Sequence, residues 1–342
     1  MKKTLLSILK YLLPLGIGIA MFFYATKDIS FASVMQQFGE AKYGYLLLGI
    51  LFFTISNMAR AYRWLLLVEP MGYKPSFKRS FLSVMVGYFI NLVFPRAGEI
   101  SRAATIQRLE GIPLTTVLGT IILERVIDVF FLFSLIIALL LVESGKVNEL
   151  LSSFLGNSFQ KITFDLYTIL LLGFVGLFVV VIIYFLYQKW KNNRIVQNIR
   201  TFIVNLLQGL TSIRKVKNQT AFWFHSLLIW VMYFWMSYIL FFCFEHTENL
   251  GLRVGFVMLV LGGIGMAAPV QGGIGTYHLL VGKAFTFYGL TAVEGQIMAT
   301  FMHTTQILII LLVGGISTII SMSLLPTIPK NSQENISTDQ KQ

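Results

Sequence analysis

Charged residues are scarce in this chain, and cysteine is almost absent. Only 12% of its 342 residues are Asp, Glu, Lys or Arg, whereas 56% are hydrophobic. Soluble proteins carry about 25% charged residues, so this composition excludes an ordinary water-soluble domain and indicates an integral membrane protein. The single cysteine, Cys243, excludes an internal disulfide and a cysteine-based metal cluster. The sequence also lacks a nucleophile elbow, a phosphate-binding loop and a metal-ligand spacing. We therefore expect no metal, no cofactor and no catalytic residue.

The chain is nevertheless strongly basic, with a net charge of +12. A nucleic-acid partner is not expected, because the basic residues lie in short segments between apolar stretches, where they orient membrane helices. The N-terminus resembles a signal peptide, with Lys2, Lys3 and Lys10 before an apolar run. No small-residue cleavage site follows, so we expect a retained anchor helix.

Apolar stretches define the predicted spans, since a helix needs about 20 apolar residues to cross a membrane. Stretches of this kind lie at residues 5–24, 43–68, 113–142, 166–187, 221–244 and 296–324. Two more, at 77–94 and 254–268, run into Pro/Gly breaks followed by semi-apolar stretches at 100–109 and 274–288. We predict that each pair forms a broken helical hairpin that enters the membrane and returns. The expected fold is an all-α polytopic membrane protein with about eight transmembrane helices, in one domain over residues 1–325.

The two breaks carry the same short motif. Residues 95–100 read PRAGEI and residues 269–274 read PVQGGI, so both follow the pattern P-x-x-G-x-I. Broken helices in corresponding positions of two halves are typical of transporters that bind substrate near the middle of the bilayer. Chance similarity of apolar segments is the alternative. We predict an inverted repeat with elements at about 77–142 and 254–324.

Basic residues predict the orientation of the chain. With the N-terminus in the cytoplasm, the inner segments carry sixteen Lys and Arg residues and the outer segments carry five. Both termini are then cytoplasmic. Residues 189–218 alternate basic and apolar groups at helical spacing, which indicates an amphipathic helix on the anionic inner leaflet or a simple linker helix. Residues 326–342 are polar and are predicted to form a disordered cytoplasmic tail.

The first break carries charge, which is costly inside a membrane and so needs a reason. Arg96 and Arg102 flank the point where a half-helix is expected to begin, near Gly98. A helix N-terminus binds anions through free backbone N–H groups, and arginine adds planar bidentate geometry, so we predict a phosphate site. Asn91 is expected to supply a further polar contact. The alternative is that Arg96 pairs with Glu99 and only fixes the hairpin.

The second break replaces charge with glycine, which permits either close helix packing or close approach of a ligand. The candidate ligand contacts beside it are Gln271, Gly272, Gly273, Gly275 and Thr276.

Polar residues recur every four positions on the helix after each hairpin, and such stripes face a bundle interior or a water-filled cavity. After the first hairpin the candidates are Glu124 and Asp128, with Arg125 beside them. After the second, His303 is a candidate that can titrate near neutral pH. The alternatives are a structural ion pair for Arg125 and a packing role for His303.

Two arginines occupy one face of the span at 43–68. We expect Arg63 to extend to the membrane interface, whereas Arg60 lies deeper and is expected to contact a lipid headgroup.

Several of these motifs together resemble one known family. They are N-x3-P-R-A-G-E-x2-R at residues 91–102, the pair Glu124-Arg125, and P-x2-G-G-I-G at residues 269–275. The sequence is similar over residues 5–324 to the lysylphosphatidylglycerol synthase transmembrane family, a flippase-like family whose members occur alone or fused to other domains. In multiple peptide resistance proteins, this type of region is implied to move aminoacylated phosphatidylglycerol between leaflets. The resemblance implies as motif positions Asn91, Arg96, Gly98, Glu99, Arg102, Arg125, Gly272, Gly273 and Gly275.

We therefore expect a lipid flippase of the cell membrane that moves a phospholipid or lipid-linked precursor between leaflets. The expected partners are that lipid and anionic inner-leaflet lipids, and the acyl chains are expected to stay in the bilayer. No soluble aminoacyl-transfer domain is found in these residues, so synthase activity is not expected. The alternatives are a membrane-embedded transferase, with Glu99, Glu124 or Asp128 as base, and an accessory subunit of a lipid-modifying or glycosyltransferase system.

Overall fold

The computed structural model of the protein describes residues 16, 19–26, 31–94, 97–155, 174 and 213–324. Within these ranges the regular elements are all helices. Four are long and apolar enough to cross a membrane: Gly44–Met71, Leu114–Val142, Gln219–Cys243 and Ala292–Ser323. They confirm the spans predicted at 43–68, 113–142, 221–244 and 296–324. The predicted span at 166–187, the tail at 326–342, and most of the segments at 5–24 and 189–218 lie outside the described residues.

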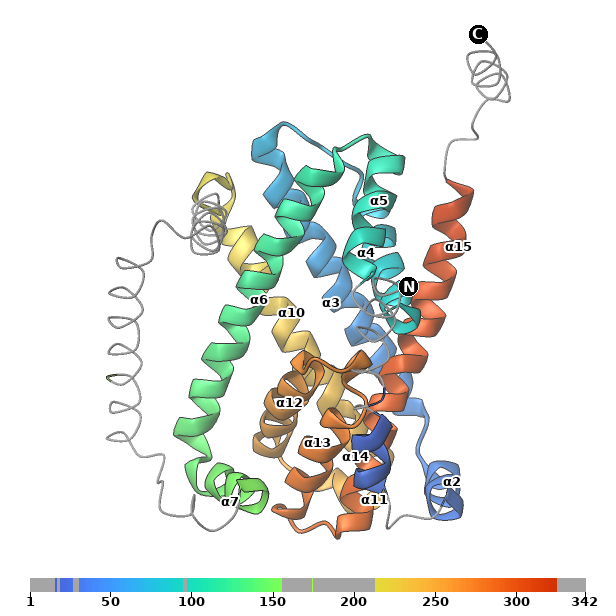
Figure 1. Ribbon diagram of the computed structural model, residues 1–342, viewed down its shortest axis with the longest axis vertical. Helices are drawn as coiled ribbons and strands as arrows, with labels where there is room; N and C mark the ends of the chain where they lie inside the picture. The colour runs from blue at the N-terminus through green and yellow to red at the C-terminus, as the bar shows by residue number, and fades with distance from the viewer. Residues whose placement is uncertain are drawn as a thin grey trace, which may run out of the picture.

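The first structural unit consists of four helices joined by short turns. α3 (Gly44–Val68) ends in the short helix η1 (Glu69–Met71), and the hairpin of α4 (Phe77–Val93) and α5 (Gly98–Glu110) leads into α6 (Leu114–Val142). α5 ends because Gly111 adopts a left-handed φ of 70°, which satisfies a terminal carbonyl, and Pro113 then precedes α6. α3 and α6 run most of the length of the molecule, whereas α4 and α5 occupy one half of it (Figure 1).

The second unit repeats this order of elements with the opposite direction. α10 (Gln219–Tyr238) continues into η4 (Ile239–Cys243), and the hairpin of α12 (Leu252–Ala267) and α13 (Thr276–Thr286) follows. A long helix closes the unit, formed by α14 (Ala292–Ile309), the π-helical turn η6 (Ile310–Gly314) and α15 (Gly315–Ser323). In Figure 1 the α4–α5 hairpin enters from the top and the α12–α13 hairpin from the bottom. The predicted inverted repeat is confirmed.

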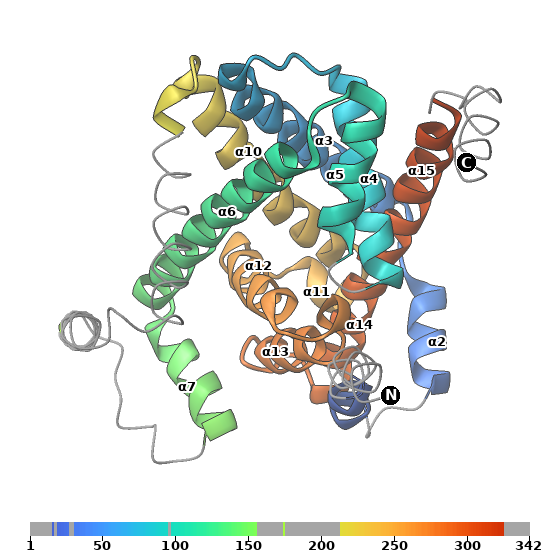
Figure 2. The same cartoon turned by 45° about the horizontal axis from the view of Figure 1, so that its top comes forward.

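Short peripheral helices occupy the lower end in Figure 1. They are α2 (Phe31–Glu40), α7 (Ser144–Leu155) and α11 (Glu245–Glu248), and the short helix η3 (Ile213–Lys215) precedes α10. The two units pack on each other most extensively through α3 and α10, and Figure 2 shows the hairpins on the same side of that pair.

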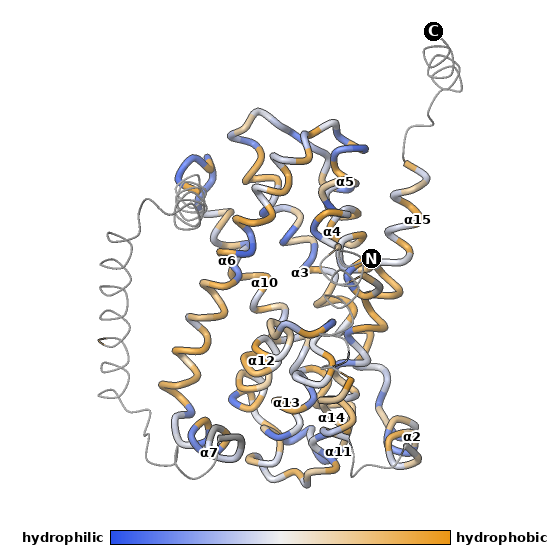
Figure 3. The backbone as a smooth tube through the Cα atoms, viewed as in Figure 1, coloured by the Kyte–Doolittle hydropathy of each residue, from blue (hydrophilic) through white to orange (hydrophobic). Residues whose placement is uncertain are grey.

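Apolar side chains cover the outside of the long helices. On α6 the exposed residues include Val129, Phe130, Phe133, Ile137 and Leu141, and Figure 3 shows this helix as a largely hydrophobic rod. A helix with an exposed apolar surface of this length is stable in lipid and not in water. The fold is that of a multi-pass helical membrane protein.

Candidate functional site

The tips of the two hairpins meet in the middle of the molecule. Gln271, in the turn between α12 and α13, donates a hydrogen bond from Nε2 to the backbone oxygen of Leu92 at the end of α4, at 3.2 Å. These residues are 179 positions apart. Pro95 and Arg96, which complete the first tip, lie outside the described residues.

The first tip is closed by its own side chains. Asn91 Oδ1 accepts a hydrogen bond from the backbone N–H of Gly98 at 2.7 Å. A Cβ atom at Gly98 would lie 2.1 Å from the oxygen of Gly87, so glycine permits the close approach of α5 to α4. Asn91 therefore occupies the N–H of Gly98, and this donor is not free for the anion predicted at this helix N-terminus. Asn91 and Gly98 build the hairpin that positions the neighbouring charges.

A group of ionised side chains lies behind this tip. Arg102 on α5 donates from Nη1 to Glu124 Oε2 at 2.6 Å, and both side chains are buried. The guanidinium of Arg102 also lies 5.6 Å from the ring centre of Trp64, whose indole N–H donates to Thr120 Oγ1 at 2.9 Å. Arg102 is thus held by a carboxylate and an aromatic face, which fixes its position between α3, α5 and α6.

Two arginines of α3 reach the same group. Arg60 Nη1 lies 2.7 Å from Asp128 Oδ2, and Arg60 Nη2 donates to the hydroxyl of Tyr233 at 3.1 Å. Arg63 Nη2 lies 2.8 Å from Asp128 Oδ1 and 3.6 Å from Glu124 Oε1. The expectation that Arg63 extends to the interface is wrong, since its side chain is 0% exposed between these carboxylates. Pairing inside the bundle removes the need for it to reach water.

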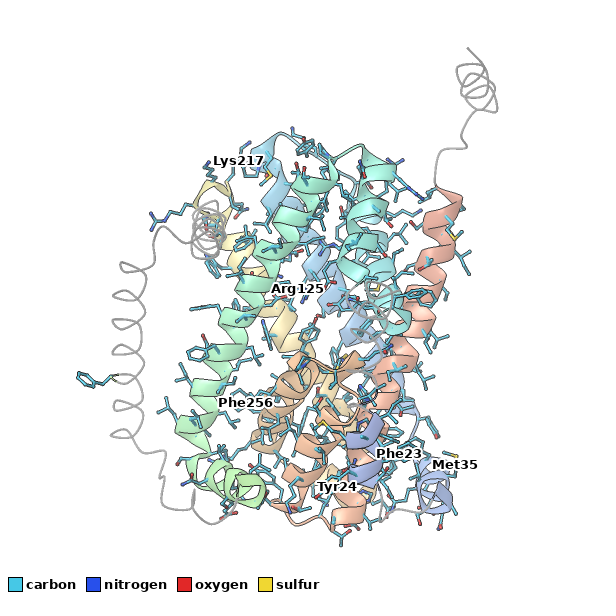
Figure 4. The ribbon with its side chains drawn as sticks, viewed as in Figure 1. Phe23, Tyr24, Met35, Arg125, Lys217 and Phe256 are labelled. Atoms are coloured by element: carbon cyan, nitrogen blue, oxygen red, sulfur yellow. The ribbon has the colours of Figure 1, made fainter. Side chains whose placement is uncertain are left out.

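Arg125 is the least constrained arginine of the group. Its Nη atoms lie 3.5 Å from Glu99 and 3.6 Å from Asp128, and 44% of its side chain is exposed. Figure 4 shows Arg125 at mid-height, above the second hairpin. Of the two carboxylates proposed as structural partners of Arg125, Asp128 lies near it. Glu124 instead pairs with Arg102 and Arg63. We call Arg60, Arg63, Arg102, Arg125, Glu99, Glu124 and Asp128 the charge cluster.

The charge cluster borders both a polar gap and an apolar surface. The gap lies between α3, α4, α5 and α6, and its lining includes Arg60, Asn91, Arg102 and Arg125. The apolar surface is a depression of about 290 Å³ along α6, formed mainly by Leu, Ile and Val with Glu99 and Arg125 at its edge. Arg125 lines both, so it connects the lipid-facing side of α6 with the interior.

The second tip has no comparable charge among its described residues. Gly272, Gly273 and Gly275 adopt positive φ angles of 57°, 72° and 85°, which make the turn between α12 and α13. Thr276 Oγ1 donates to the backbone oxygens of Gly265 and Gly273, at 2.7 and 3.1 Å. His303 Nε2 lies 2.8 Å from the oxygen of Gly272. These predicted residues come together in the structure, and each of them is used to hold the turn.

The part of the chain that the structure describes contains no group of three or more metal-ligating side chains. Three aromatic residues that the sequence did not single out adjoin the charge cluster. Tyr233 contacts Arg60, Trp64 contacts Arg102, and Tyr88 contacts Tyr233. Their hydroxyl and indole groups gave no signal, because aromatic residues are common in spans. The spacing of Arg60 and Arg63 on one span, and of Glu124 and Asp128 on another, is the signal that could have paired these helices.

Comparisons with known proteins agree with this architecture. Residues 11–314 match the family described as "Lysylphosphatidylglycerol synthase TM region". The chain is also similar to the "UPF0104 membrane protein MJ1595" of Methanocaldococcus jannaschii, at 28% identity over 141 residues, which cover 40% of each protein. No solved structure matches the chain. Because the family match extends over most of its length, the protein belongs to the lysylphosphatidylglycerol synthase transmembrane-region family of multi-pass membrane proteins.

Proposed function

We propose that the protein moves an anionic membrane lipid between leaflets and that the charge cluster binds its headgroup. The observation that carries this proposal is the position of Arg125, an exposed cation at the junction of the lipid-facing depression and the interior gap. A charged headgroup that moves through the interior of the membrane needs a counter-charge. An unpaired charged side chain in the hydrocarbon region costs on the order of 2.5–3.5 kcal/mol.

The charge balance of the cluster favours an anion. Four arginines face three carboxylates, which leaves one positive charge. Several buried guanidinium N–H groups also have no acceptor within the described residues, among them Arg60 Nε, Arg102 Nε and Arg102 Nη2. A phosphate offers acceptor oxygens in the planar geometry that guanidinium groups bind.

The inverted repeat supports translocation over simple binding. Its two hairpins enter from opposite ends and touch at their tips, so a site between them can be opened to either side by movement of one unit against the other. The resemblance of the chain to a lysylphosphatidylglycerol synthase region directs the choice of substrate to an acidic phospholipid or its aminoacylated form. We propose that the protein acts in the cell membrane with both termini in the cytoplasm.

A transferase is the less favoured function. Its base would be Glu99, Glu124 or Asp128, yet each of these carboxylates lies within ion-pair distance of at least one arginine. Pairing with a cation stabilises the ionised carboxylate and weakens it as a proton acceptor.

Replacing Arg125 tests the proposal. In vesicles that contain a fluorescent phosphatidylglycerol, Arg125→Ala is expected to slow leaflet exchange about 10- to 100-fold, the range for loss of a charged hydrogen bond. Arg125→Lys is expected to restore only part of the rate, because an ammonium group keeps the charge and loses the planar fork. Exchange is measured as protection of the fluorophore from an impermeant reductant.

A matched control is available in Arg79, which is 42% exposed and lies 3.6 Å from Glu110 at the end of the molecule. Arg79→Ala removes a similar partly exposed ion pair far from the gap and is expected to leave exchange unchanged. Equal loss of exchange in Arg79→Ala and Arg125→Ala, or none in either, would contradict the assignment of the headgroup site to Arg125.

A further inference from the structure

A second cavity, larger and more apolar than the gap in the charge cluster, lies between the two structural units. Its volume is about 240 Å³, and α3, α4, α10, α12, α13 and α14 contribute to its wall. Apolar side chains dominate its lining, including Phe53, Met236, Leu240, Met258, Met302 and Ile309. We call it the inter-unit cavity. An apolar cavity of about 150 Å³ in another protein stays dry and binds small hydrocarbons, so this one is large enough for part of a hydrocarbon chain.

The wall of the cavity is adaptable. Four of its lining residues are methionines, Met236, Met258, Met266 and Met302. Methionine is unbranched and polarisable, so it adjusts to apolar ligands of different shape and is common on surfaces that bind varied partners. A wall of this kind suits flexible methylene chains better than a rigid ligand.

One end of the cavity is polar and adjoins the charge cluster. Tyr88 lines both the cavity and the polar gap, and its hydroxyl lies 3.4 Å from that of Tyr233. Tyr233 in turn accepts a hydrogen bond from Arg60. Trp230 also lines the cavity, and its buried indole N–H has no acceptor in the described part of the chain. An indole N–H that is buried usually has a partner.

This arrangement matches one amphiphile. The apolar part of the cavity is followed by the indole N–H of Trp230 and by the hydroxyl groups of Tyr88 and Tyr233. Arg60 comes next, hydrogen-bonded to Tyr233. A glycerophospholipid has the same sequence of groups, with an acyl chain, an ester oxygen that accepts hydrogen bonds, and an anionic phosphate. A free fatty acid lacks the separate ester and phosphate positions.

We propose that the inter-unit cavity binds one acyl chain of a phospholipid, with an ester oxygen accepting a hydrogen bond from Trp230. The assignment rests on the proposed function for the identity of the ligand and differs from the expectation that the acyl chains stay in the bilayer. In this arrangement the translocated lipid lies across Tyr88 and Tyr233. Its headgroup contacts the charge cluster, and one acyl chain lies in the inter-unit cavity.

Photo-crosslinking tests the site directly. The full-length protein is reconstituted in phosphatidylcholine vesicles with a phosphatidylglycerol that carries a diazirine in one acyl chain, and the adducts are mapped by mass spectrometry. We expect adducts at the cavity methionines Met236, Met258 or Met302, in addition to those on lipid-facing residues such as Phe130 and Phe133. Adducts restricted to the lipid-facing residues would overturn the proposal.

Two pairs of variants make the assignment specific. Ser237 lines the cavity whereas Ser134 is exposed on α6, so Ser237→Leu is expected to reduce the cavity adducts severalfold and Ser134→Leu to leave them unchanged. Trp230→Phe keeps an aromatic ring but removes the donor, and it is expected to reduce the adducts about fivefold, the factor for a single hydrogen bond. Trp235→Phe is the control, because Trp235 is on the same helix and does not line the cavity.

The adducts and leaflet exchange separate the two proposals. Cavity adducts without any leaflet exchange in the wild-type protein would support the acyl-chain site and contradict the proposed translocation of lipid. Exchange without cavity adducts would retain translocation and overturn the acyl-chain site. Loss of adducts in Trp235→Phe as well as Trp230→Phe would count against a specific role of the Trp230 indole.

Discussion

At the scale of single residues, the charge cluster combines a high cost of burial with ion pairs between its side chains. Arg63 and Glu124 are both almost completely buried, and transfer of ions from water into such a site is repaid only when each finds a partner. Arg102 holds Glu124, and Asp128 lies between Arg60 and Arg63. These pairs connect α3, α5 and α6, so the cluster fixes the position of the first hairpin as well as providing charge.

Breaking the Arg102–Glu124 pair is therefore expected to destabilise the protein. Glu124→Gln leaves Arg102 without an anionic partner, and Arg102→Met leaves Glu124 Oε2 without its donor, so each single variant should lose about 3–5 kcal/mol. The double variant removes both charges and keeps the overall balance of the cluster, while Arg63 retains Asp128 at 2.8 Å. It should be more stable than either single variant. Thermal unfolding in detergent measures the three values, and additive losses in the double variant would contradict the pairing.

At the scale of elements, close approach of helices without side chains between them shapes the hairpins. Gly87 and Gly98 bring α4 and α5 together, and in the second unit Gly265 lies against the backbone of Tyr277. Both hairpins are short relative to a full span, and packing of backbone on backbone compensates for the small apolar area that each half-helix offers.

Gly98→Ala is expected to be strongly disruptive for this reason. The new methyl group would lie 2.1 Å from Gly87 O and 2.4 Å from Asn91 Cγ, so α5 would have to move away from α4, at a cost of at least about 1–3 kcal/mol. Gly119→Ala on α6 is the matched control, because its Cβ would meet no atom within 4 Å. Alanine at that position should stabilise the helix by about 0.5–1 kcal/mol. The thermal midpoints in detergent should shift in opposite directions, and equal shifts would contradict close packing at Gly98.

At the scale of the whole molecule, the sequence predicts the architecture better than the contacts of its site. Length and hydropathy were enough for the four described spans, and the repeated P-x-x-G-x-I motif was enough for the two hairpins, because both signals are local. The burial of Arg63 in ion pairs was not predicted correctly, and no partner was predicted for Asn91, since both depend on which faces of α3, α4, α5 and α6 meet. The helical spacing of charged residues marks the polar face of each helix, but it does not say which other helix that face meets. The predicted role of Arg96 stays a prediction, because that residue lies outside the described ranges.

The distribution of basic residues predicts the orientation of the whole chain in the membrane. Lys217 precedes α10 at the top of the molecule in Figure 4, and α7, which contains Glu149, lies at the bottom. If the basic ends of the segments face the cytoplasm, these positions lie on opposite sides of the membrane. Single cysteines are introduced as Lys217→Cys and Glu149→Cys in a Cys243→Ser background, and intact cells are treated with an impermeant thiol reagent. We expect reaction at position 149 alone, and at both positions after permeabilisation. Labelling at position 217 alone in intact cells would reverse the orientation, so that the α4–α5 hairpin with Arg125 beside it would enter from outside.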